Sequence, residues 1–343
     1  MSSFHSRFSL PLLFSLLLFV SISSAAYAQA QPQPTWRYFR LGNPADSTAK
    51  PVGGYALMGG GGQQSDAFRF LCEHANGGDF LILRANTDDD YAREVNAEIK
   101  SICPLNSVGT IVFSDREASD DPKIPQIIDQ AESIFFAGGD QSNYIRFWQD
   151  TPVQDALNRH IAAGKPIGGS SAGLAILGEF SFASIVDTIH SPEALADPFG
   201  SKVTLSRDFL RIPLLASTIT DTHFVKRDRL GRLLAFMARI LQDNWTPRVR
   251  AIAVEENAAL LVELDGSSRV VGSGPVIFLE STRPPEVCAH HQPLTFTGVT
   301  SLRVDPGGTF PVSTWRWPGD TYTLSVEKGV LTSSAPGGPY NKK

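Results

Sequence analysis

The chain has 343 residues, of which 42% are hydrophobic, and a formal net charge of −5 at pH 7. This length fits one large α/β domain with an appendage, or two small domains. The mild acidity and the lack of any Lys/Arg run argue against nucleic-acid binding. No second long apolar run follows the one at the N-terminus, so we expect no membrane span after it.

The first 28 residues have the pattern of a secretory signal peptide. Arg7 supplies a positive charge, residues 11–20 form an apolar run, and Ala26-Tyr27-Ala28 fits a cleavage site. The run is short for a membrane anchor, which needs roughly 20 residues. We therefore predict an exported protein, secreted or periplasmic, whose mature chain begins near Gln29.

Alternating strands and helices are predicted after a Gln- and Pro-rich lead-in, which we place at residues 29–52. Such alternation is typical of a parallel sheet covered by helices on both faces. The predicted elements are strands at 55–58, 80–83, 110–113, 133–136 and 165–167, and helices at 66–74, 91–102, 124–130 and 155–163.

The character of the chain changes after residue 186. A loop-like region over 187–207 leads to a β-rich segment at 217–220 and an apolar helix at 229–241. Beyond Arg250 the chain consists mainly of short strands and turns. We interpret residues 53–265 as the α/β domain and residues 266–343 as a β-rich C-terminal extension packed on it.

Residues 168–174, Gly-Gly-Ser-Ser-Ala-Gly-Leu, have the pattern of a nucleophile elbow between a strand and a helix. Gly169 and Gly173 flank Ser171, and small neighbours are needed because the sharp turn strains the backbone of the nucleophile. The turn also directs the N–H of Ala172 toward a developing oxyanion. We predict that Ser171 is a nucleophile; the alternative is an ordinary glycine-rich turn.

A serine nucleophile needs a base and an acid that orients the base. His223 is the favoured base because it follows the segment 217–220, at the strand end where open parallel sheets form their crevice. The alternative is a histidine with only structural bonds. The candidate acids between Ser171 and His223 are Glu179, Asp187, Glu193 and Asp197. Glu179 is too close behind the elbow helix to reach the base easily, whereas the loop residues Asp187 and Glu193 are free to do so, and spacing does not separate these two.

Two further sets of residues are candidates for contact with a substrate. Gly139 follows a strand and offers a second oxyanion N–H, and Gln141 is placed to orient substrate. Arg227, Arg229 and Arg232 follow His223, and arginine binds carboxylates with two parallel hydrogen bonds. A substrate with carboxylates is therefore expected; the alternative is pairing of these arginines with Asp221 and Asp228.

The three cysteines and the histidines at 290 and 291 are candidates for a disulfide and a metal site. An oxidising compartment permits a disulfide. Cys72 lies on the first predicted helix and Cys103 at the end of the second, and helices that flank neighbouring strands can bring the two within bridging distance, so we predict this pair. The rival pair is Cys103–Cys288. The segment 288–291, Cys-Ala-His-His, has no second ligand pair at a suitable spacing, so we predict no metal.

Three motifs together resemble the cyanophycinases, which are serine peptidases related to the aspartyl dipeptidases. They are Phe-Phe-Ala-Gly-Gly-Asp-Gln (135–141), Gly-Gly-Ser-Ser-Ala-Gly (168–173), and Asp-Thr-His-Phe (221–224) followed by the three arginines. The resemblance spans about residues 53–265. It implies a three-layer α/β/α sandwich like that of class I glutamine amidotransferases, and no cofactor.

The resemblance also implies roles for individual residues. Ser171 would be the nucleophile and His223 the base, and Glu193 best matches the family's acid in the loop after the elbow. The substrate-contact positions of the family would be occupied here by Gln141, Asp221, Arg227, Arg229 and Arg232. Two positions depart from the family, since Thr222 replaces a glutamine and Ser170 a common threonine.

The favoured function is a secreted serine exopeptidase that hydrolyses aspartyl peptide bonds, including β-Asp-Arg bonds, through a Ser-His-Glu triad. Its expected partners are an aspartate-containing peptide and, as an assembly to be considered, a second copy in a homodimer. One alternative is an α/β-hydrolase esterase, whose triad runs Ser, acid, His. The other is a non-catalytic secreted binding protein on the same fold.

Overall fold

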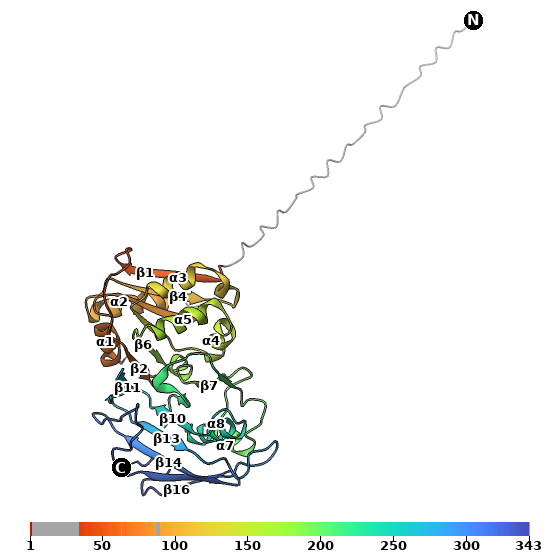
Figure 1. Cartoon of the computed structure of the whole chain (residues 1–343). Helices are drawn as coiled ribbons and strands as arrows, with labels where there is room; N and C mark the ends of the chain where they lie inside the picture. Colours follow the sequence, from red (N-terminus) through yellow and green to blue (C-terminus); the bar gives the residue numbers. More distant parts are fainter. Residues whose placement is uncertain (2–33, 63, 87–89, 343) are drawn as a thin grey trace. The chain divides into compact units, whose positions relative to one another are not determined.

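A computed structural model of the chain describes Met1 and residues 34–62, 64–86 and 90–342. The predicted signal peptide, apart from Met1, lies outside the described residues. Pro34–Lys343 forms one compact unit, which Figure 1 shows with its helices and strands labelled. Within the described ranges, no helix is both long and apolar enough to span a membrane.

The first of two sheets has eight strands, and its inner five are parallel. The outer strands β1, β11 and β12 run antiparallel to their neighbours. The mostly parallel sheet predicted from the sequence is therefore present. In spatial order the strands are β1 (Trp36–Gly42), β4 (Ser107–Phe113), β3 (Asp79–Ala85), β5 (Ser133–Phe136), β6 (Ile167–Ser170), β2 (Gly54–Met58), β11 (Ala258–Glu263) and β12 (Ser268–Gly272).

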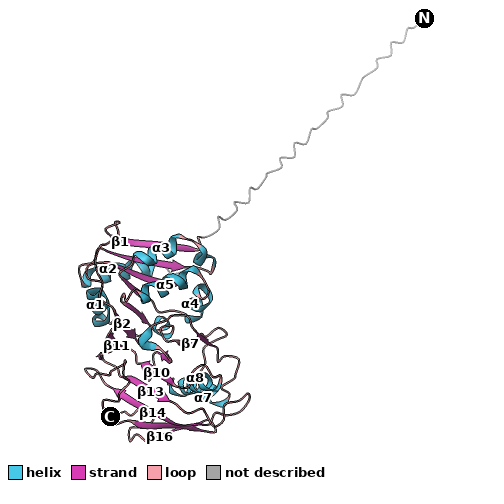
Figure 2. Cartoon of the chain, in the orientation of Figure 1, coloured by secondary structure: helices cyan, strands magenta, loops and turns pink. Residues whose placement is uncertain are grey.

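Helices cover both faces of this sheet, as the colouring of Figure 2 makes visible. Successive side chains of a strand point to opposite faces: Phe80 and Ile82 pack with α1 (Ser65–His74) and α2 (Asp90–Ile102), whereas Leu81 and Leu83 pack on the other side. The predicted three-layer α/β/α arrangement is confirmed. The helices of the second face are α3 (Lys123–Gln130), α4 (Gln141–Trp148) and α5 (Pro152–Ala162).

A second eight-stranded sheet is formed by the later part of the chain. Its strands β7, β9 and β10 are parallel, and the others are antiparallel. In spatial order they are β16 (Val330–Ser333), β15 (Tyr322–Glu327), β14 (Phe296–Val304), β13 (Val276–Ser281), β10 (Val249–Val254), β9 (Thr218–Asp221), β7 (Phe180–Phe182) and β8 (Leu205–Arg207).

The second sheet shares its core with the first. Ile252, Val254 and Phe278 lie in the same buried cluster as Leu81 and Leu83 of the first sheet. On its other face, α7 (Ser191–Ala196) and α8 (Leu230–Gln242) pack over a separate cluster. The strand-rich C-terminal region is therefore present as predicted, and it is paired into both sheets through β12 and β13–β16.

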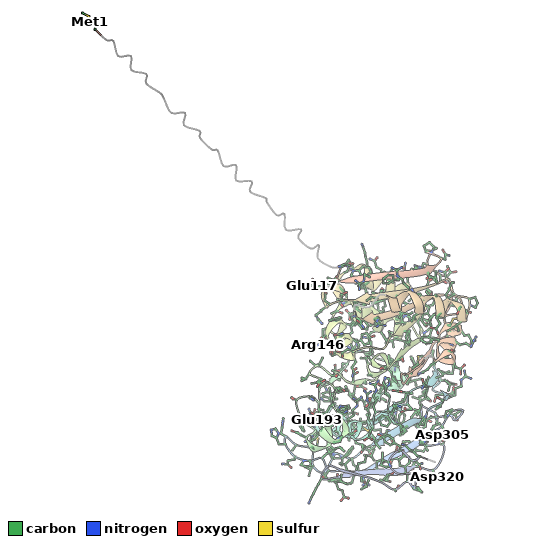
Figure 3. All side chains as sticks on the ribbon, turned by 180° about the vertical axis from the view of Figure 1, so that it is seen from behind. Met1, Glu117, Arg146, Glu193, Asp305 and Asp320 are labelled. Atoms are coloured by element: carbon green, nitrogen blue, oxygen red, sulfur yellow. A yellow bond between two sulfur atoms is a disulfide. The ribbon has the colours of Figure 1, made fainter. Side chains whose placement is uncertain are left out.

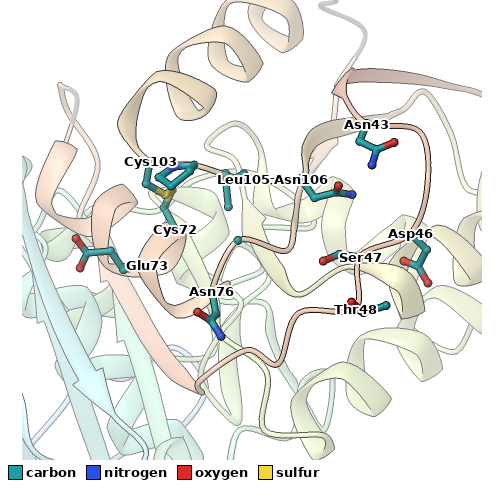
Figure 4. Close-up of a pocket in the computed structure, with 12 residues that line it drawn as sticks. Asn43, Asp46, Ser47, Thr48, Cys72, Glu73, Asn76, Cys103, Leu105 and Asn106 are labelled. Carbon is teal, nitrogen blue, oxygen red and sulfur yellow. A yellow bond between two sulfur atoms is a disulfide. The ribbon is translucent and has the colours of Figure 1, made fainter.

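The disulfide Cys72–Cys103 joins the end of α1 to the residue after α2, with the Cα atoms 6.3 Å apart. The predicted pair is confirmed and its rival is wrong, because Cys288 is a buried free thiol. Figure 4 shows the bridge at the wall of a polar surface groove that also contains Glu73 and Asn106.

Candidate active site

The nucleophile elbow predicted at residues 168–174 has the geometry of a strained turn. β6 ends at Ser170, α6 (Ala172–Ala175) begins two residues later, and Ser171 between them has φ 53° and ψ −117°. A Cβ on Gly173 would lie 2.1 Å from the carbonyl oxygen of Phe136, so only glycine fits there. These neighbours hold Ser171 at the apex of the turn.

His223 lies where β9 ends, and its imidazole meets the serine. The Oγ of Ser171 and the Nε2 of His223 are 2.7 Å apart. The backbone N–H of His223 donates to the carbonyl of Gly59 at 2.9 Å. Gly60, at φ +95°, lies directly against the ring, since a Cβ there would be 2.4 Å from Nε2. The glycine run after β2 therefore seats the histidine.

The acid beside His223 is Glu256, which was not among the predicted candidates. Its Oε1 lies 2.7 Å from the Nδ1 of His223. The predicted acid, Glu193, is instead on α7 with its side chain 47% exposed, and pairs with Lys202 at 3.4 Å. Figure 3 labels Glu193 at the margin of the molecule. The prediction of Glu193 is corrected to Glu256, and Asp187 also pairs with Lys202, at 3.3 Å.

The missed residue has a signal of the same kind that indicated His223. Glu256 follows the strand-like run 251–254, and β10 is the parallel neighbour of β9. Parallel neighbours place their carboxyl ends together, so the residues after the two strands meet. The predicted acids all lie between the serine and the histidine in the sequence, whereas Glu256 follows a strand that comes after the histidine.

The preceding residue, Glu255, holds the backbone of the same loop. Its carboxylate accepts hydrogen bonds from the N–H groups of Val225 and Lys226, the second at 3.1 Å. The two adjacent acids therefore have different contacts: Glu256 is hydrogen-bonded to the imidazole of His223, and Glu255 holds the backbone of Val225 and Lys226.

The surroundings of His223, and its burial above all, favour a neutral imidazole. Burial lowers the pKa of His223, and the nearby cations Arg227 and Arg229 lower it further, against the opposing effect of Glu256. The hydrogen bond to His223 lowers the pKa of Glu256. An ionised carboxylate only accepts, so Nδ1 of the imidazole carries the proton and Nε2 is free to accept from the hydroxyl of Ser171.

Ala172 and Gly139, the residues predicted to supply the oxyanion N–H groups, lie on two segments beside the nucleophile. Ala172 is the first residue of α6, and the first N–H groups of a helix have no acceptor within it. The loop after β5 passes close to the serine: a Cβ on Gly138 would lie 3.5 Å from the Cβ of Ser171. Gly139 lines the same cleft, of about 460 Å³, as Ser171 and His223.

The predicted substrate-contact residues divide into two groups. Arg227 has a side chain that is 52% exposed and lines both the cleft and an adjoining hollow of about 590 Å³. Gln141 and Arg229 also line that hollow. Arg229 donates to the carbonyl and the hydroxyl of Thr222, both at 2.9 Å, and burial lowers its pKa to about 10.

Asp221 and Arg232 form a buried pair and not a substrate contact. The guanidinium donates two hydrogen bonds to the carboxylate, at 2.9 and 2.5 Å, and the two side chains are 4% and 3% exposed. Neither lines the cleft or the adjoining hollow. Their predicted contact with substrate is corrected, because α8 turns the side chain of Arg232 toward the end of β9.

The described part of the chain has no grouping of three or more His, Cys, Asp or Glu side chains suited to a metal ion. Cys288, at the start of the segment considered for metal, is buried, and burial raises the pKa of its thiol to about 12.

Ser171, His223 and Glu256 form one hydrogen-bonded series, and the serine lies on a strained turn of an α/β fold. This is the arrangement of a serine hydrolase. Residues 85–200, which include Ser171 but neither His223 nor Glu256, match the model of Peptidase family S51. A crystal structure of a peptidase from an acI-B1 Actinobacterium has a similar fold, with a TM-score of 0.52 and 16% identity over 76% of this chain and 97% of that one.

Curated relatives give the same relationship. The chain is 28% identical over 214 residues to a cyanophycinase of Synechococcus elongatus, which is 61% of this chain and 62% of the relative. It is 27% identical over 191 residues to a cyanophycinase of a Nostoc species, covering 53% and 57%. The matches thus span about three fifths of the length of these relatives. The predicted resemblance is confirmed: the chain is similar to Peptidase family S51 over residues 85–200, and to the cyanophycinases.

Proposed function

We propose that this protein is a serine peptidase that hydrolyses peptide bonds at aspartyl residues. The observation that carries the proposal is the unbroken series from Ser171 through His223 to Glu256, with both contacts at 2.7 Å. The relationship to family S51 supports a peptidase. The chain order Ser, His, Glu argues against the α/β-hydrolase esterase, in which the acid precedes the histidine.

The geometry supports a two-step acyl transfer. His223 removes the proton of Ser171 through Nε2 as Oγ attacks the carbonyl carbon of the scissile bond. Glu256 stabilises the imidazolium that forms, and the N–H groups of Ala172 and Gly139 are proposed to bind the oxyanion. The imidazolium then protonates the leaving amine, and a water molecule, activated by the same histidine, hydrolyses the acyl-enzyme.

An acidic substrate fits the surroundings of the nucleophile. Arg227 is exposed at the junction of the cleft and the adjoining hollow, where Gln141 and Arg229 also lie. Guanidinium groups bind carboxylates strongly in such partly desolvated places. The relatives are named cyanophycinases, so we include β-Asp-Arg peptides among the substrates, and we propose that the protein acts after export.

A fluorophosphonate probe tests the nucleophile directly. We expect it to label the wild-type protein, while Ser171→Ala is unlabelled and inactive yet folded. Hydrolysis of cyanophycin, β-Asp-Arg and a panel of Asp-Xaa dipeptides, compared with the same peptides carrying asparagine, then identifies the substrate. Labelling without any hydrolysis of acidic peptides would exclude the aspartyl specificity, and no labelling would indicate the non-catalytic binding protein.

The two glutamates provide a matched test of the acid. Glu256→Gln should lower kcat by roughly 10³- to 10⁴-fold, because the neutral amide no longer holds the imidazole in the required tautomer. Glu193→Gln is the control and should change kcat little, since its carboxylate pairs with Lys202. Steady-state kinetics on one acidic peptide make the comparison, and a larger loss in Glu193→Gln would contradict the assignment of Glu256.

A further inference from the structure

The loop that carries the candidate base is held from a distant part of the chain. This loop, residues 222–229, runs from the end of β9 to the start of α8 and includes His223 and Arg227. The residues after β16, 334–342, fold back as tight turns, with hydrogen bonds from Gly338 to Ala335 and from Lys342 to Gly337. We call these residues the C-terminal tail.

Tyr340 of the tail makes two hydrogen bonds with the end of that loop. Its hydroxyl donates to the Oδ1 of Asp228 at 2.7 Å and accepts from the backbone N–H of Leu230 at 3.1 Å. Leu230 is the first residue of α8, and no side chain caps this helix from its own N-cap residue, Arg229. The tyrosine therefore supplies an acceptor for the first N–H of the helix, while the Oγ of Ser191 accepts from the N–H of Arg232 at 3.2 Å.

Further contacts fix the tyrosine itself. Its ring packs edge-to-face on Phe224, the residue after the candidate base, with the ring centroids 5.8 Å apart. Its carbonyl accepts from Arg303 of β14 at 3.3 Å. Tyr340 thus connects the second sheet to both ends of the segment 224–230.

Asp228 lies in the left-handed region of backbone conformation and is held by two other elements of the fold. Its φ is +48°, a conformation that side-chain residues seldom adopt. Its carbonyl accepts a hydrogen bond from Ser191 on α7, so the carboxylate and the carbonyl of one residue are each held by a different element. Loss of either contact should loosen the turn that directs Arg227 and His223 toward the cleft.

We propose that the C-terminal tail clamps the loop 222–229, and that Tyr340 is a positioning residue for the Ser171–His223 pair. The inference depends on the proposed peptidase function only for its kinetic consequences. The tail lies beyond the region that carries the three sequence motifs, so the motif region alone does not contain the whole support of its own active site.

Tyr340→Phe is the decisive variant, because it keeps the ring and removes both hydrogen bonds. We expect kcat on the best acidic peptide to fall about tenfold, because only part of the free energy of the lost charge-assisted hydrogen bond should affect the positions of Ser171 and His223. The change in KM should be smaller. Tyr38→Phe is the control: it removes a hydroxyl on the edge strand β1 and should leave kcat unchanged.

A pH profile separates positioning from a general loss of stability. Burial lowers the pKa of His223, and a looser loop would admit water to its ring and so raise this pKa. The pH at which Ser171 reacts half-maximally with the probe should therefore rise in Tyr340→Phe. The charged groups beside the imidazole, Glu256, Arg227 and Arg229, are unchanged in this variant. Asp228→Gly, which tolerates a positive φ and removes the acceptor of the tyrosine hydroxyl, should give the same shift, and the double variant should add little to either single change.

Amide hydrogen exchange tests the clamp without any activity. Residues 224–232 should exchange faster in Tyr340→Phe than in the wild type or in Tyr38→Phe. Wild-type exchange, kcat and pH profile in Tyr340→Phe would overturn the proposal. Failure of the wild type to react at Ser171 would instead refute the proposed function, and the exchange rates would still decide whether Tyr340 holds the loop.

Discussion

At the residue scale, the candidate nucleophile and the candidate base extend from unusual backbone conformations. Ser171 and His223 have φ of 53° and 48°, and each such residue costs roughly 1–3 kcal/mol of strain. The strand end at residues 58–59 offsets part of this strain: the carbonyl of Met58 accepts from the N–H of Ser171 at 3.1 Å, and that of Gly59 from His223 at 2.9 Å. One short segment therefore aligns both partners before substrate arrives.

The pH dependence of the reaction should follow the pKa of His223. Only the neutral imidazole accepts the serine proton, so activity is lost as the pH falls through this pKa. Burial and the neighbouring cations lower it below the ordinary 6.5, and we expect the acidic limb of kcat/KM below pH 6.5. Arg227→Gln removes a positive charge that disfavours the imidazolium, so this limb should move to higher pH. Arg159→Gln, whose partner is Asp129, is the control.

Two arginines that are close in sequence should respond differently to replacement. Arg232→Ala leaves the buried carboxylate of Asp221 with Arg229, 3.6 Å away, as its remaining cationic neighbour, and should lower the free energy of unfolding by up to about 3–5 kcal/mol. Arg227→Ala should leave stability nearly unchanged and lower kcat/KM on acidic peptides by roughly tenfold to a hundredfold. Urea unfolding and steady-state kinetics measure the two effects. A stable Arg232→Ala variant with a raised KM would restore the original substrate-contact prediction.

At the element scale, the site is formed where parallel strands of both sheets end. β2, β5 and β6 of the first sheet lead to the glycine run, Gly139 and Ser171, whereas β9 and β10 of the second lead to His223 and Glu256. Asn257 joins the two sets, since its N–H donates to Gly60 at 2.8 Å and its side chain accepts from Gly62 at 2.7 Å. The next strand, β11, then enters the first sheet.

The disulfide between α1 and α2 should contribute measurably to stability. Its cysteines are 31 positions apart, and closing a loop of this length restricts the unfolded chain by about 3–4 kcal/mol. Cys72→Ser/Cys103→Ser should lower the free energy of unfolding by about this amount in urea. A reductant should reproduce the loss in the wild type and have no further effect on the double variant. Equal stability of wild type and variant would show that the bridge does not constrain the unfolded state.

At the scale of the whole molecule, the two sheets are stabilised by one continuous core. The buried cluster that contains Leu83 of β3 also contains Val254 of β10 and Phe278 of β13. β13 in turn pairs with β10 through six residue pairs, from Val249 with Ser281 to Val254 with Val276. The region after residue 265 is therefore part of the support for the strand that presents Glu256.

A chain ending at Asp265 should consequently not fold as a stable unit. It would leave β10 at the edge of its sheet and expose apolar side chains that β13 and β14 now cover. Residues 34–343 should unfold in a single transition, followed by circular dichroism, whereas the shortened chain should show no cooperative transition. Cooperative unfolding of the shortened chain, with retained probe labelling of Ser171, would show that the C-terminal region is a separate domain.

Local patterns were sufficient for much of the fold and part of the site. Apolar periodicity located most strands and helices, and glycine spacing identified Ser171 because a tight turn restricts side-chain size within a few neighbouring residues. The strand before His223 was also predictable, because its β-rich pattern is local to residues 217–220. α4 was missed, although Asp140 caps it by accepting from the N–H of Ser142 at 2.9 Å.

Other features depend on which distant segments pack together. Glu256 meets His223 only because β10 pairs with β9, and Arg232 turns inward because α8 packs over that pair of strands. Tyr340 reaches Asp228 across 112 positions of the chain. Spacing along the sequence carries no record of such pairings, because the free energy that selects them comes from burying whole faces of sheets and helices. The sequence alone therefore determined the candidate nucleophile and base, while the tertiary structure decided the candidate acid, the buried ion pair and the support of the loop.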